Sequence, residues 1–370
     1  MTERKLRVLL LFGGRSSEHS VSCVTAAGVM HAIDRERFEI VPVGISRDGG
    51  WTLLDQDPEG WALNTGKLPE ISTLDHPVHL STDAQKTSLL AYSESTVTDL
   101  GEIDVVFPLL HGPFGEDGSI QGILEMAGVS YVGSGIAASA MGMDKHFMKV
   151  VFEGAGFKVG PYEVITNKQW LRDSEASMKR CENLQYPLFV KPARAGSSVG
   201  ITKVDEPSGL RAAIEIARAE DPKVIVEQGI VGREIECGVL EGRGSNPSRA
   251  SLPGEIAVAD NEHTFYDFEA KYVDGAAAKL SCPADLSEPA TREIRDLAVK
   301  AFDAIDAEGL SRVDFFYTPE GEWIINEINT MPGFTPSSMY PQMWAKTGIE
   351  YRELIDELIA LATERNIGLR

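Results

Sequence analysis

The first third of the chain alternates between apolar runs and amphipathic stretches. Residues 6–14, LRVLLLFGG, are continuously apolar and end in glycines, as buried parallel strands do. The stretch 16–34 then predicts a helix with Ser16 or Ser17 as its N-cap. The elements predicted after it are a strand at 38–45, a strand at 103–112, a helix at 119–128 and a short strand at 129–135. Strands that alternate with helices predict a Rossmann-like α/β domain over residues 1–133.

Beyond residue 133 the pattern changes, because short strands outnumber helices. Residues 134–228 predict an α+β unit with helices at 139–156 and 208–220 and strands at 161–166, 187–193, 199–204 and 223–228. Residues 229–370 predict a third unit with strands at 234–240 and 254–259, a long polar loop at 260–286, a helix at 288–305 and a hairpin. Segment 51–100 is polar and irregular, and it predicts no element. The chain therefore divides into three domains of mixed α/β and α+β class.

Composition narrows the classes of function. The apolar content of 43% and the charged content of 25% are ordinary for a globular chain, and the net charge of -21 argues against a nucleic-acid or acidic-membrane binder. The cysteines, Cys23, Cys181, Cys237 and Cys282, are scattered without a CxxC pair, which favours buried thiols over disulfides or a zinc site. Neither a secretory leader nor a run of about 20 apolar residues is found. We therefore expect a cytoplasmic protein without membrane partners.

The sequence LSRVDFFYTPEGEWIINEIN, residues 310–329, predicts a β-hairpin. A two-residue turn at Glu320 and Gly321 would place Asp314 directly opposite Glu327. Two carboxylates in such a position repel each other, and a divalent cation removes the repulsion. The hairpin is therefore a candidate metal site.

The same register places Arg312 opposite Asn329, so four polar side chains share one face. The other face is mostly apolar and includes Asn326. Asp, Glu and Asn together form an all-oxygen set, which suits Mg²⁺ better than zinc, and phosphates of a substrate often complete the Mg²⁺ shell. The alternative is a solvated polar face on which Arg312 pairs with an acid. A slip of one residue would remove the arrangement.

A loop rich in glycine and serine, FVKPARAGSSVGITKV at 189–204, joins two predicted strands. It lacks the spacing of a P-loop, but its backbone N–H groups at 196–200 can approach phosphates closely, and Lys191 can point at the same place. An ordinary hairpin loop is the alternative. Downstream, Glu227 and Glu234 can hold an adenine amine and ribose hydroxyls, or they can simply be solvated.

The order of several motifs is informative. These motifs are GGRSSEHSVS, HGPFGEDGSIQG, MDKHFMK, VKPARAGSSVG, YDFEAKY, SRVDFF and NEINTMPGFTPSS. Together they resemble the D-alanine–D-alanine ligase family of the ATP-grasp superfamily, over residues 6–348 with 51–100 as the weak stretch. The resemblance implies a three-domain ATP-grasp architecture, with an N-terminal Rossmann-like domain and with ATP held between the central and C-terminal domains.

The resemblance also implies residues for nucleotide and metal. Lys145 and Lys191 match the lysines that bind phosphate. The other matched nucleotide residues are Ser198, Glu227, Gln228, Ile230 and Glu234. The matched metal ligands are Asp314, Glu327 and Asn329, in agreement with the hairpin argument. Two Mg²⁺ ions bridged by Glu327 are expected, for which Mn²⁺ can substitute, and assistance by a monovalent cation is left open.

For the two D-alanine substrates, the resemblance implies a separate set of residues. Glu18 pairs with the ammonium group of the first D-alanine, close to His111. Arg312 and the backbone N–H of Gly333 stabilise an oxyanion. The implied reaction phosphorylates the first carboxylate, and the amine of the second D-alanine then attacks the acyl phosphate. Its product is a peptidoglycan precursor, and the family is usually homodimeric.

The second D-alanine is expected at the start of a helix. Ser338 and Met339 offer N–H groups and a dipole that favour its carboxylate, and Lys271 of loop 260–286 adds a positive charge. Tyr272, Ser197 and Glu18 resemble a triad that closes this loop as a lid and excludes water.

Some residue choices depart from the family pattern or are variable within it. Ala193 and Ala195 stand where relatives often carry polar residues, which bears on the dynamics of the loop. Met331, Phe334 and Pro336 are expected to shape the pocket.

Two rival functions remain. A D-alanine–D-lactate ligase, which forms an ester, resembles the sequence over most of its length but differs at the lid, where Lys271 and Tyr272 favour the peptide-forming enzyme. A non-catalytic nucleotide-binding protein with the same fold is the second rival. The intact set of lysines and metal ligands argues against it.

Overall fold

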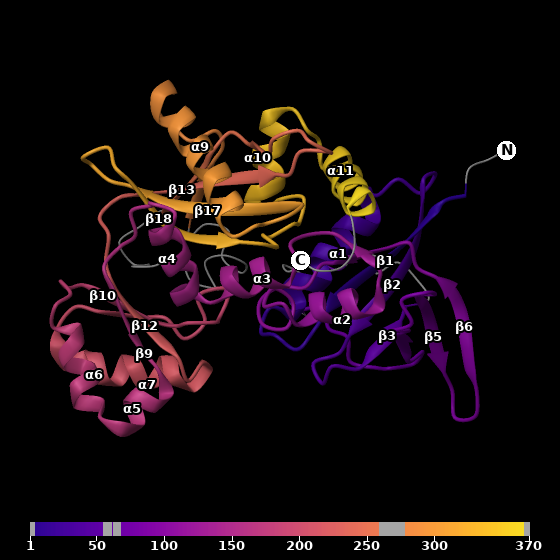
Figure 1. The fold of residues 1–370 in the computed structure, drawn as a ribbon, viewed down its shortest axis with the longest axis horizontal. Coiled ribbons are helices and arrows are strands. Elements are labelled where there is room, and N and C mark those ends of the chain that lie inside the picture. Colours follow the sequence, from indigo (N-terminus) through magenta and orange to yellow (C-terminus); the bar gives the residue numbers. More distant parts are fainter. Residues whose placement is uncertain (1–3, 55–60, 62–67, 259–277, 366–370) are drawn as a thin grey trace.

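The computed structural model describes residues 4–54, 61, 68–258 and 278–365. Figure 1 shows three groups of elements: N-terminal elements at the right, a small sheet with its helices at the lower left, and a larger sheet with α9, α10 and α11 at the top. The functional site lies where these groups meet.

The N-terminal group is built on a mainly parallel sheet of order β3-β2-β1-β7-β8. Its elements are β1 Leu6–Gly13, α1 His19–Ala32, β2 Phe38–Ile45, β3 Trp51–Leu53, β7 Val105–Pro108, α2 Ser119–Ala127 and β8 Ser130–Tyr131. Strand β1 is buried on both faces, because Val8 and Leu10 contribute to one apolar cluster and Leu9 and Leu11 to another. This explains its unbroken run of apolar residues.

The described part of segment 51–100 contains four strands that the sequence pattern did not predict. One is β3, and the others are β4 Val78–Leu80, β5 Ser88–Tyr92 and β6 Val97–Glu102, which form a separate antiparallel sheet. Most of β6 is exposed and β4 has only three residues, so neither shows a clear alternation of apolar and polar positions.

Two predicted helix boundaries are wrong. Helix α1 begins at His19, with Glu18 rather than a serine at its N-cap, because the Ser16 hydroxyl donates to the His111 carbonyl at 2.7 Å. The predicted helix 139–156 is two helices, α3 Ile136–Met143 and α4 Lys145–Gly154. Asp144 separates them in an extended conformation, and its side chain accepts hydrogen bonds from the first N–H groups of α4. The break follows from this capping.

The central group is an antiparallel sheet of order β11-β10-β12-β9 with helices on one face. Its elements are β9 Tyr162–Ile165, α5 Asn167–Arg172, α6 Ser174–Cys181, β10 Leu188–Pro192, β11 Thr202–Val204, η1 Pro207–Gly209, α7 Leu210–Glu220 and β12 Val224–Gln228. The predicted strands of this section and helix 208–220 are confirmed. The other face of the sheet turns towards the C-terminal group and carries Lys191 and Glu227 into a cleft.

The C-terminal group is an antiparallel sheet of order β16-β15-β13-β17-β18, with β14 paired to β13. Its elements are β13 Arg233–Leu240, β14 Arg249–Ala250, β15 Gly254–Val258, β16 Ala278–Ser281, α9 Glu288–Ala304, β17 Leu310–Tyr317, β18 Trp323–Asn329, α10 Met339–Thr347 and α11 Tyr351–Glu364. Strand β16 lies within the predicted loop 260–286, so residues 278–281 are not a loop as expected, and residues 260–277 lie outside the described part of the chain. Helices α9, α3 and α4 pack on one face of this sheet.

The β17–β18 hairpin has the predicted pairing at its open end. Asp314 pairs with Glu327 and Arg312 pairs with Asn329. The opposite face belongs to the core, where Val313 is fully buried. The polar face required for the metal hypothesis is therefore present.

Two deviations from the predicted hairpin cancel each other. Residues 318–322 connect the strands, so the connection is longer than the two-residue turn that was expected. A β-bulge between Asp314 and Phe315 then shifts the register by one, with Asn326 as the extra residue of β18. The bulge also places Asn326 at the cleft, not on the apolar face.

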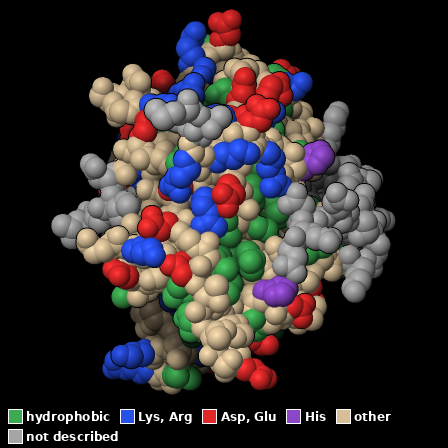
Figure 2. All heavy atoms as spheres, turned by 90° about the vertical axis from the view of Figure 1, so that its right-hand side faces the viewer, with side chains coloured by type: hydrophobic (Ala, Val, Ile, Leu, Met, Phe, Trp, Pro, Cys, Tyr) green, Lys and Arg blue, Asp and Glu red, His purple; other side chains and the backbone are tan. Residues whose placement is uncertain are grey.

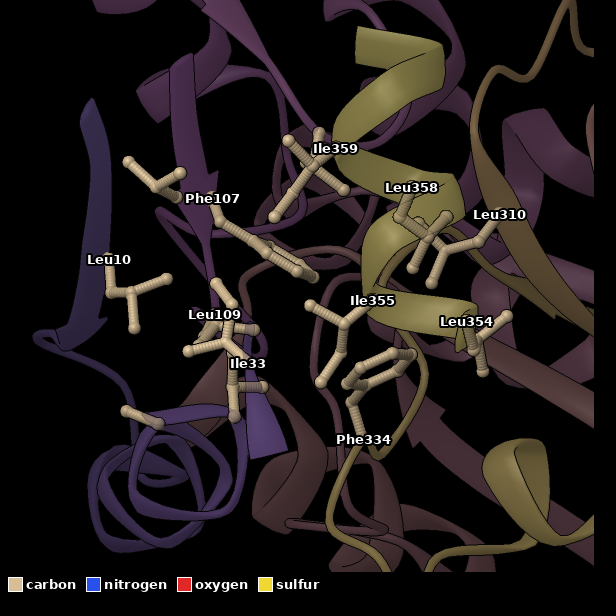
Figure 3. Packing of buried hydrophobic residues seen from close by; sticks show 14 of the residues in the cluster. Leu10, Ile33, Phe107, Leu109, Leu310, Phe334, Leu354, Ile355, Leu358 and Ile359 are labelled. Atoms are coloured by element: carbon tan, nitrogen blue, oxygen red, sulfur yellow. The ribbon is translucent and has the colours of Figure 1, made fainter. Parts of the chain in front are cut away.

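The end of the chain completes the N-terminal core. Figure 3 shows Ile355 and Ile359 of α11 on the side of Phe107 of β7, with Leu354 and Leu358 on the side of Leu310, and these residues belong to one buried cluster. Phe334 joins this cluster, with its ring centroid 5.9 Å from that of Phe107 in an edge-to-face arrangement. The expectation that Phe334 shapes the pocket is therefore wrong, whereas Met331 and Pro336 do line the cleft.

The surface carries mixed charges. Figure 2 shows acidic and basic side chains interspersed on the side of the N-terminal group, with a strip of hydrophobic side chains between them. Among the described residues, no helix has the length and apolarity needed to cross a membrane. The four cysteines are free, and all but Cys282 are buried.

The buried position of Phe334 generates a stability prediction. Phe334→Ala should lower the free energy of unfolding by about 3–5 kcal/mol, because it opens a cavity between the N-terminal sheet and α11. Thermal unfolding followed by circular dichroism measures this loss. The matched control is Phe147→Ala on α4, whose side chain is 54% exposed. Equal melting temperatures for both variants would contradict the role assigned to Phe334.

Candidate functional site

A cleft of about 900 Å³ lies between the central sheet and the C-terminal sheet and reaches the loops of the N-terminal group. Every predicted site residue that the structure describes lines it. These are Glu18, His111, Lys145, Lys191, Ser197, Ser198, Glu227, Gln228, Ile230, Glu234, Arg312, Asp314, Glu327, Asn329, Gly333, Ser338 and Met339. Lys271 and Tyr272 lie outside the described residues. The motifs, which are far apart in sequence, thus converge on one cavity.

Arg312 is the central cation of the polar hairpin face. Its Nε and Nη2 donate to the two oxygens of Asp314, each at 2.7 Å, and its Nε lies 3.2 Å from Oε1 of Glu236. Burial alone lowers the pKa of Arg312, but the carboxylates of Asp314 and Glu236 outweigh this effect and raise it well above its usual value. Arg312 is therefore a fixed positive charge.

The donors on this face fit a hard divalent cation. Asp314 and Glu327 pair across neighbouring strands, and the Asn329 amide donates to Asp314 at 3.1 Å. Lys145 lies 3.5 Å from Glu327 and donates to the Ala195 carbonyl at 3.2 Å. Within the described residues, His, Cys, Asp and Glu side chains form no cluster of three that could hold a metal. A cation here would need oxygens from Asn329 and from a ligand as well.

Two lysines share one buried carboxylate in the nucleotide half of the cleft. Lys149 lies 2.6 Å and Lys191 lies 2.5 Å from Glu227. Burial raises the pKa of Glu227, yet the two lysines outweigh it and hold the pKa well below its usual range. Lys149 was not predicted from the sequence, although it follows Lys145 by four residues and so faces the same side of the helix.

The glycine–serine loop reaches across the cleft to the N-terminal group. The Ser197 hydroxyl donates to the Glu18 carboxylate, as the predicted triad requires. Ser197 and Ser198 have positive φ angles of 46° and 60°, which few non-glycine residues adopt. A Cβ atom at Gly196 would lie 2.4 Å from Oε2 of Glu18, so a larger residue there would displace the Glu18 carboxylate. The loop is anchored by a two-pronged pair between Arg194 and Asp221.

His111 is fully buried, and its protonation can be deduced from its partners. Burial lowers its pKa, so the imidazole is neutral. Nδ1 lies 3.2 Å from the Met331 carbonyl, which can only accept, so Nδ1 carries the proton. Nε2 then accepts from the Thr25 hydroxyl at 3.3 Å. His111 thereby ties the N-terminal group to the loop that carries Gly333.

Glu116, in the same HGPFGEDG motif, was not predicted as a site residue. One oxygen accepts from the Gly112 N–H at 2.7 Å and the other accepts from the Met331 N–H at 3.2 Å. His111 and Glu116 therefore hold the carbonyl and the N–H of the same residue, Met331. Burial, reinforced by the charge of Glu18, raises the pKa of Glu116 to about 8.

The start of α10 closes the far end of the cleft. Ser338 is the N-cap residue, and its hydroxyl accepts from the Thr335 N–H at 3.1 Å instead of capping the helix. A Cβ atom at Gly333 would lie 3.2 Å from that hydroxyl. The first N–H groups of α10 are thus left for an anionic ligand.

Comparisons with known proteins agree with this geometry. Residues 7–134 match the family model described as D-ala D-ala ligase N-terminus, and residues 151–360 match the one described as D-ala D-ala ligase C-terminus. The chain belongs to the D-alanine–D-alanine ligase family. The three-domain ATP-grasp architecture and the mixed α/β and α+β class expected from the sequence are confirmed.

Relatives in this family are similar over nearly the whole chain. A protein from Arthrobacter sp. (strain FB24) named D-alanine--D-alanine ligase is 62% identical over 99% of this chain and 96% of its own length. One of the same name from Streptomyces griseus is 52% identical over 99% and 95%. The solved VanG D-Ala:D-Ser ligase from Enterococcus faecalis has a TM-score of 0.82 and 37% identity, covering 97% of this chain and 100% of that one. The D-alanine-D-alanine ligase from Coxiella burnetii has a TM-score of 0.80 and 34% identity over 98% and 95%.

The raised pKa of Glu116 generates a pH-dependent prediction. Its value of about 8 exceeds the ordinary 4.5, so the folded protein binds the proton more tightly than the unfolded chain does. The stability that this group contributes is full below pH 4.5 and is lost as the pH rises to about 8, at no more than about 1.4 kcal/mol per pH unit. The melting temperature of Glu116→Gln minus that of the wild type should therefore increase as the pH rises from 5 to 8.

Melting curves of the ligand-free proteins across this pH range measure the difference. Glu320→Gln, in the exposed hairpin connection, is the control and should give a flat difference. A flat difference for Glu116→Gln as well would show that Glu116 is not protonated in the folded protein.

Proposed function

We propose that this chain joins two D-alanine molecules to D-alanyl-D-alanine for peptidoglycan precursor synthesis, with conversion of ATP to ADP and phosphate. The observation that carries the proposal is the convergence of the motif residues on one cleft that three separate groups of elements form. The names of relatives between 52% and 62% identical support the same substrates. Because ATP is a substrate and the cysteines are free thiols, we place the reaction in the cytoplasm.

The central sheet and the β12–β13 connection would hold the nucleotide. Lys145, Lys191 and the Ser198 loop line the part of the cleft that suits phosphates, and the backbone at 228–230 suits the adenine, with Glu227 near its amine and Glu234 near the ribose. Lys191 is already charged and held by Glu227. The phosphates of ATP would therefore meet the ammonium group of Lys191 already fixed in the cleft, and they would share it with Glu227.

Asp314, Glu327 and Asn329 would hold two Mg²⁺ ions, or Mn²⁺ in their place, and a monovalent cation is a further possible aid. When bound, such ions neutralise charge on the transferring phosphoryl group. The all-oxygen donor set and the opposed carboxylates support this assignment. Because this face of the protein lacks enough oxygen ligands to complete the coordination of the metal ions, the ions and the nucleotide would bind together.

The N-terminal group would bind the first D-alanine. Glu18 offers a carboxylate for the ammonium group, oriented by the hydroxyl of Ser197. The neutral His111 lies in the same part of the cleft. With the substrate carboxylate turned towards Arg312, its phosphorylation and the later attack would take place where a fixed cation and the Gly333 N–H can balance the developing negative charge.

The second D-alanine would bind at the start of α10. Ser338 and Met339 line the cleft there, and the positive end of the helix favours a carboxylate. Lys271 and Tyr272 are assigned to this substrate and to lid closure from the sequence resemblance alone. The presence of lysine and tyrosine next to each other at these positions supports peptide rather than ester formation. The similarity to a structure named as a D-Ala:D-Ser ligase makes D-serine the acceptor to test beside D-lactate.

A phosphate-release assay tests the proposed reaction. Release should require D-alanine and Mg²⁺ together, and mass spectrometry should detect D-alanyl-D-alanine. D-lactate at pH 6 or D-serine should give little mixed product, and a dominant mixed product would overturn the choice of acceptor.

Glu327→Ala should abolish release while the melting temperature stays close to that of Glu320→Ala, an exposed acid in the same hairpin. Substantial remaining activity in Glu327→Ala would refute the metal assignment, and no activity under any condition would favour a non-catalytic binding protein.

We also propose a homodimer, as the family resemblance implies. Three apolar residues in or just before α2 are exposed: Phe114 at 45%, Ile123 at 44% and Met126 at 73%. Light scattering should give about twice the 40.3 kDa chain mass, and Met126→Glu should shift the mass towards that of one chain if this surface is the interface. A wild-type mass of one chain would contradict the proposal.

A further inference from the structure

A row of three carboxylates crosses the polar face of the C-terminal sheet. Glu236 of β13 pairs with Asp314 of β17, and Asp314 pairs with Glu327 of β18. Asp314 therefore has an acid on each side, separated from it by one strand spacing. Like charges at directly opposite positions destabilise a sheet unless cations lie between them.

Arg312 is the cation between the first two members of this row. It lies two residues from Asp314 along β17, opposite Asn329 on one side and Gly238 on the other. The rings of Tyr340 and Trp344 fill the space over Gly238, so the open side of Arg312 is the one towards Asp314 and Glu236. The guanidinium can therefore contact Asp314 and Glu236 at once, with Nε 2.7 Å from the first and 3.2 Å from the second.

The contact with Asp314 occupies both of its oxygens. Nε binds Oδ1 and Nη2 binds Oδ2, and Asn329 donates to Oδ2 as well. Asp314 is also one of the two carboxylates proposed to hold metal. A divalent cation bound there would repel the guanidinium and compete for the same oxygens, so Arg312 needs another anion if it is to stay charged and in place.

Glu236 is suited to be that anion. It is 4% exposed, it lines the same cleft, and its side chain approaches Arg312 from the side away from Glu327. We propose that Glu236 is a positioning residue that holds Arg312 when Asp314 binds metal, so that metal binding transfers the guanidinium from Asp314 towards Glu236. This inference rests on the metal assignment of the proposed function. It adds a residue that acts through Arg312 rather than on the substrate.

Two substitutions at this position separate charge from shape. Glu236→Gln keeps the size of the side chain and removes its charge, whereas Glu236→Asp keeps the charge and shortens the side chain. If Glu236 only fills space, Gln is the milder change. If its charge holds Arg312, Asp is the milder change, and Gln leaves Arg312 bound to Asp314 alone, where it competes with metal.

The main measurement is Mn²⁺ binding to the full-length protein with ADP and without D-alanine, followed by electron paramagnetic resonance. Glu236→Gln should weaken Mn²⁺ binding about tenfold, within the range typical for residues that support metal ligands, and Glu236→Asp should stay within about threefold of the wild type. The control Glu255→Gln removes the 2.7 Å ion pair with Arg233 in the same sheet and should leave Mn²⁺ binding unchanged. The inference would be overturned if Glu236→Gln weakened Mn²⁺ binding less than Glu236→Asp did, or if all variants bound Mn²⁺ equally well.

A double-mutant cycle tests whether the effect passes through Arg312. In an Arg312→Met background, Glu236→Gln should change Mn²⁺ binding by less than about threefold, because no guanidinium is left to compete. The same tenfold loss in both backgrounds would mean that Glu236 acts on the metal directly, and it would refute the positioning role. This readout needs no turnover, so it holds for inactive variants.

Steady-state kinetics supply an independent readout. Glu236→Gln should lower kcat and raise the Mg²⁺ concentration needed for half-maximal rate. The KM for the first D-alanine should stay within about threefold, because the ammonium group of that substrate is assigned to Glu18, which is not a member of the row. If Glu327→Ala leaves Mn²⁺ binding intact, the metal site itself is wrong. If Glu327→Ala abolishes binding and the Glu236 variants bind like the wild type, only the present inference fails.

Discussion

Balance of charge across the β13–β17–β18 sheet is the constraint on which the site depends. Three acids occupy adjacent positions on neighbouring strands, and such a row is tolerable in a folded protein only with cations close by. Arg312 and Lys145 supply two of them permanently. In the proposed function, the remaining negative charge makes this face a place for divalent ions and for the phosphates that arrive with them. A few lysines fixed in the cleft would then let a chain with a net charge of -21 bind an anionic nucleotide.

The position of this face relative to the substrates depends on contacts between groups that are remote in sequence. Met331 is held by His111 at its carbonyl and by Glu116 at its N–H. The Ser197 hydroxyl bridges the glycine–serine loop and Glu18. These contacts use polar groups that are buried or half-buried, so losing one partner leaves the other poorly satisfied. These polar contacts therefore fix the relative positions of the loops around the cleft more specifically than apolar packing alone would.

Local features were predictable from the sequence, and pairings between remote strands were not. The strand 38–45 and the pairing of Asp314 with Glu327 followed from periodicity and from the hairpin. The bulge at Asn326 was not predictable, because the longer connection shifts the register by one residue in the opposite direction. The pairing at the open end of the hairpin is therefore the same as in a regular hairpin with a two-residue turn. Glu236 was missed for a different reason: the pairing of β13 with β17 spans more than 70 residues, and no pattern in a single sequence specifies it. The helix break at Asp144 was a missed capping signal.

The position of α11 has a consequence for the order in which this protein can be completed during synthesis. The apolar face formed by β1 and β7 is covered by residues 354–362, which the ribosome makes only after all the strands around the cleft. Until then, Phe107 and its neighbours in the first domain lack their cover, although β1 and β7 emerged much earlier. Exposed apolar surface of this kind promotes aggregation of incomplete chains. The first domain is therefore not an independent folding unit, and loss of α11 would expose the core of the first domain although the sheets around the cleft would remain.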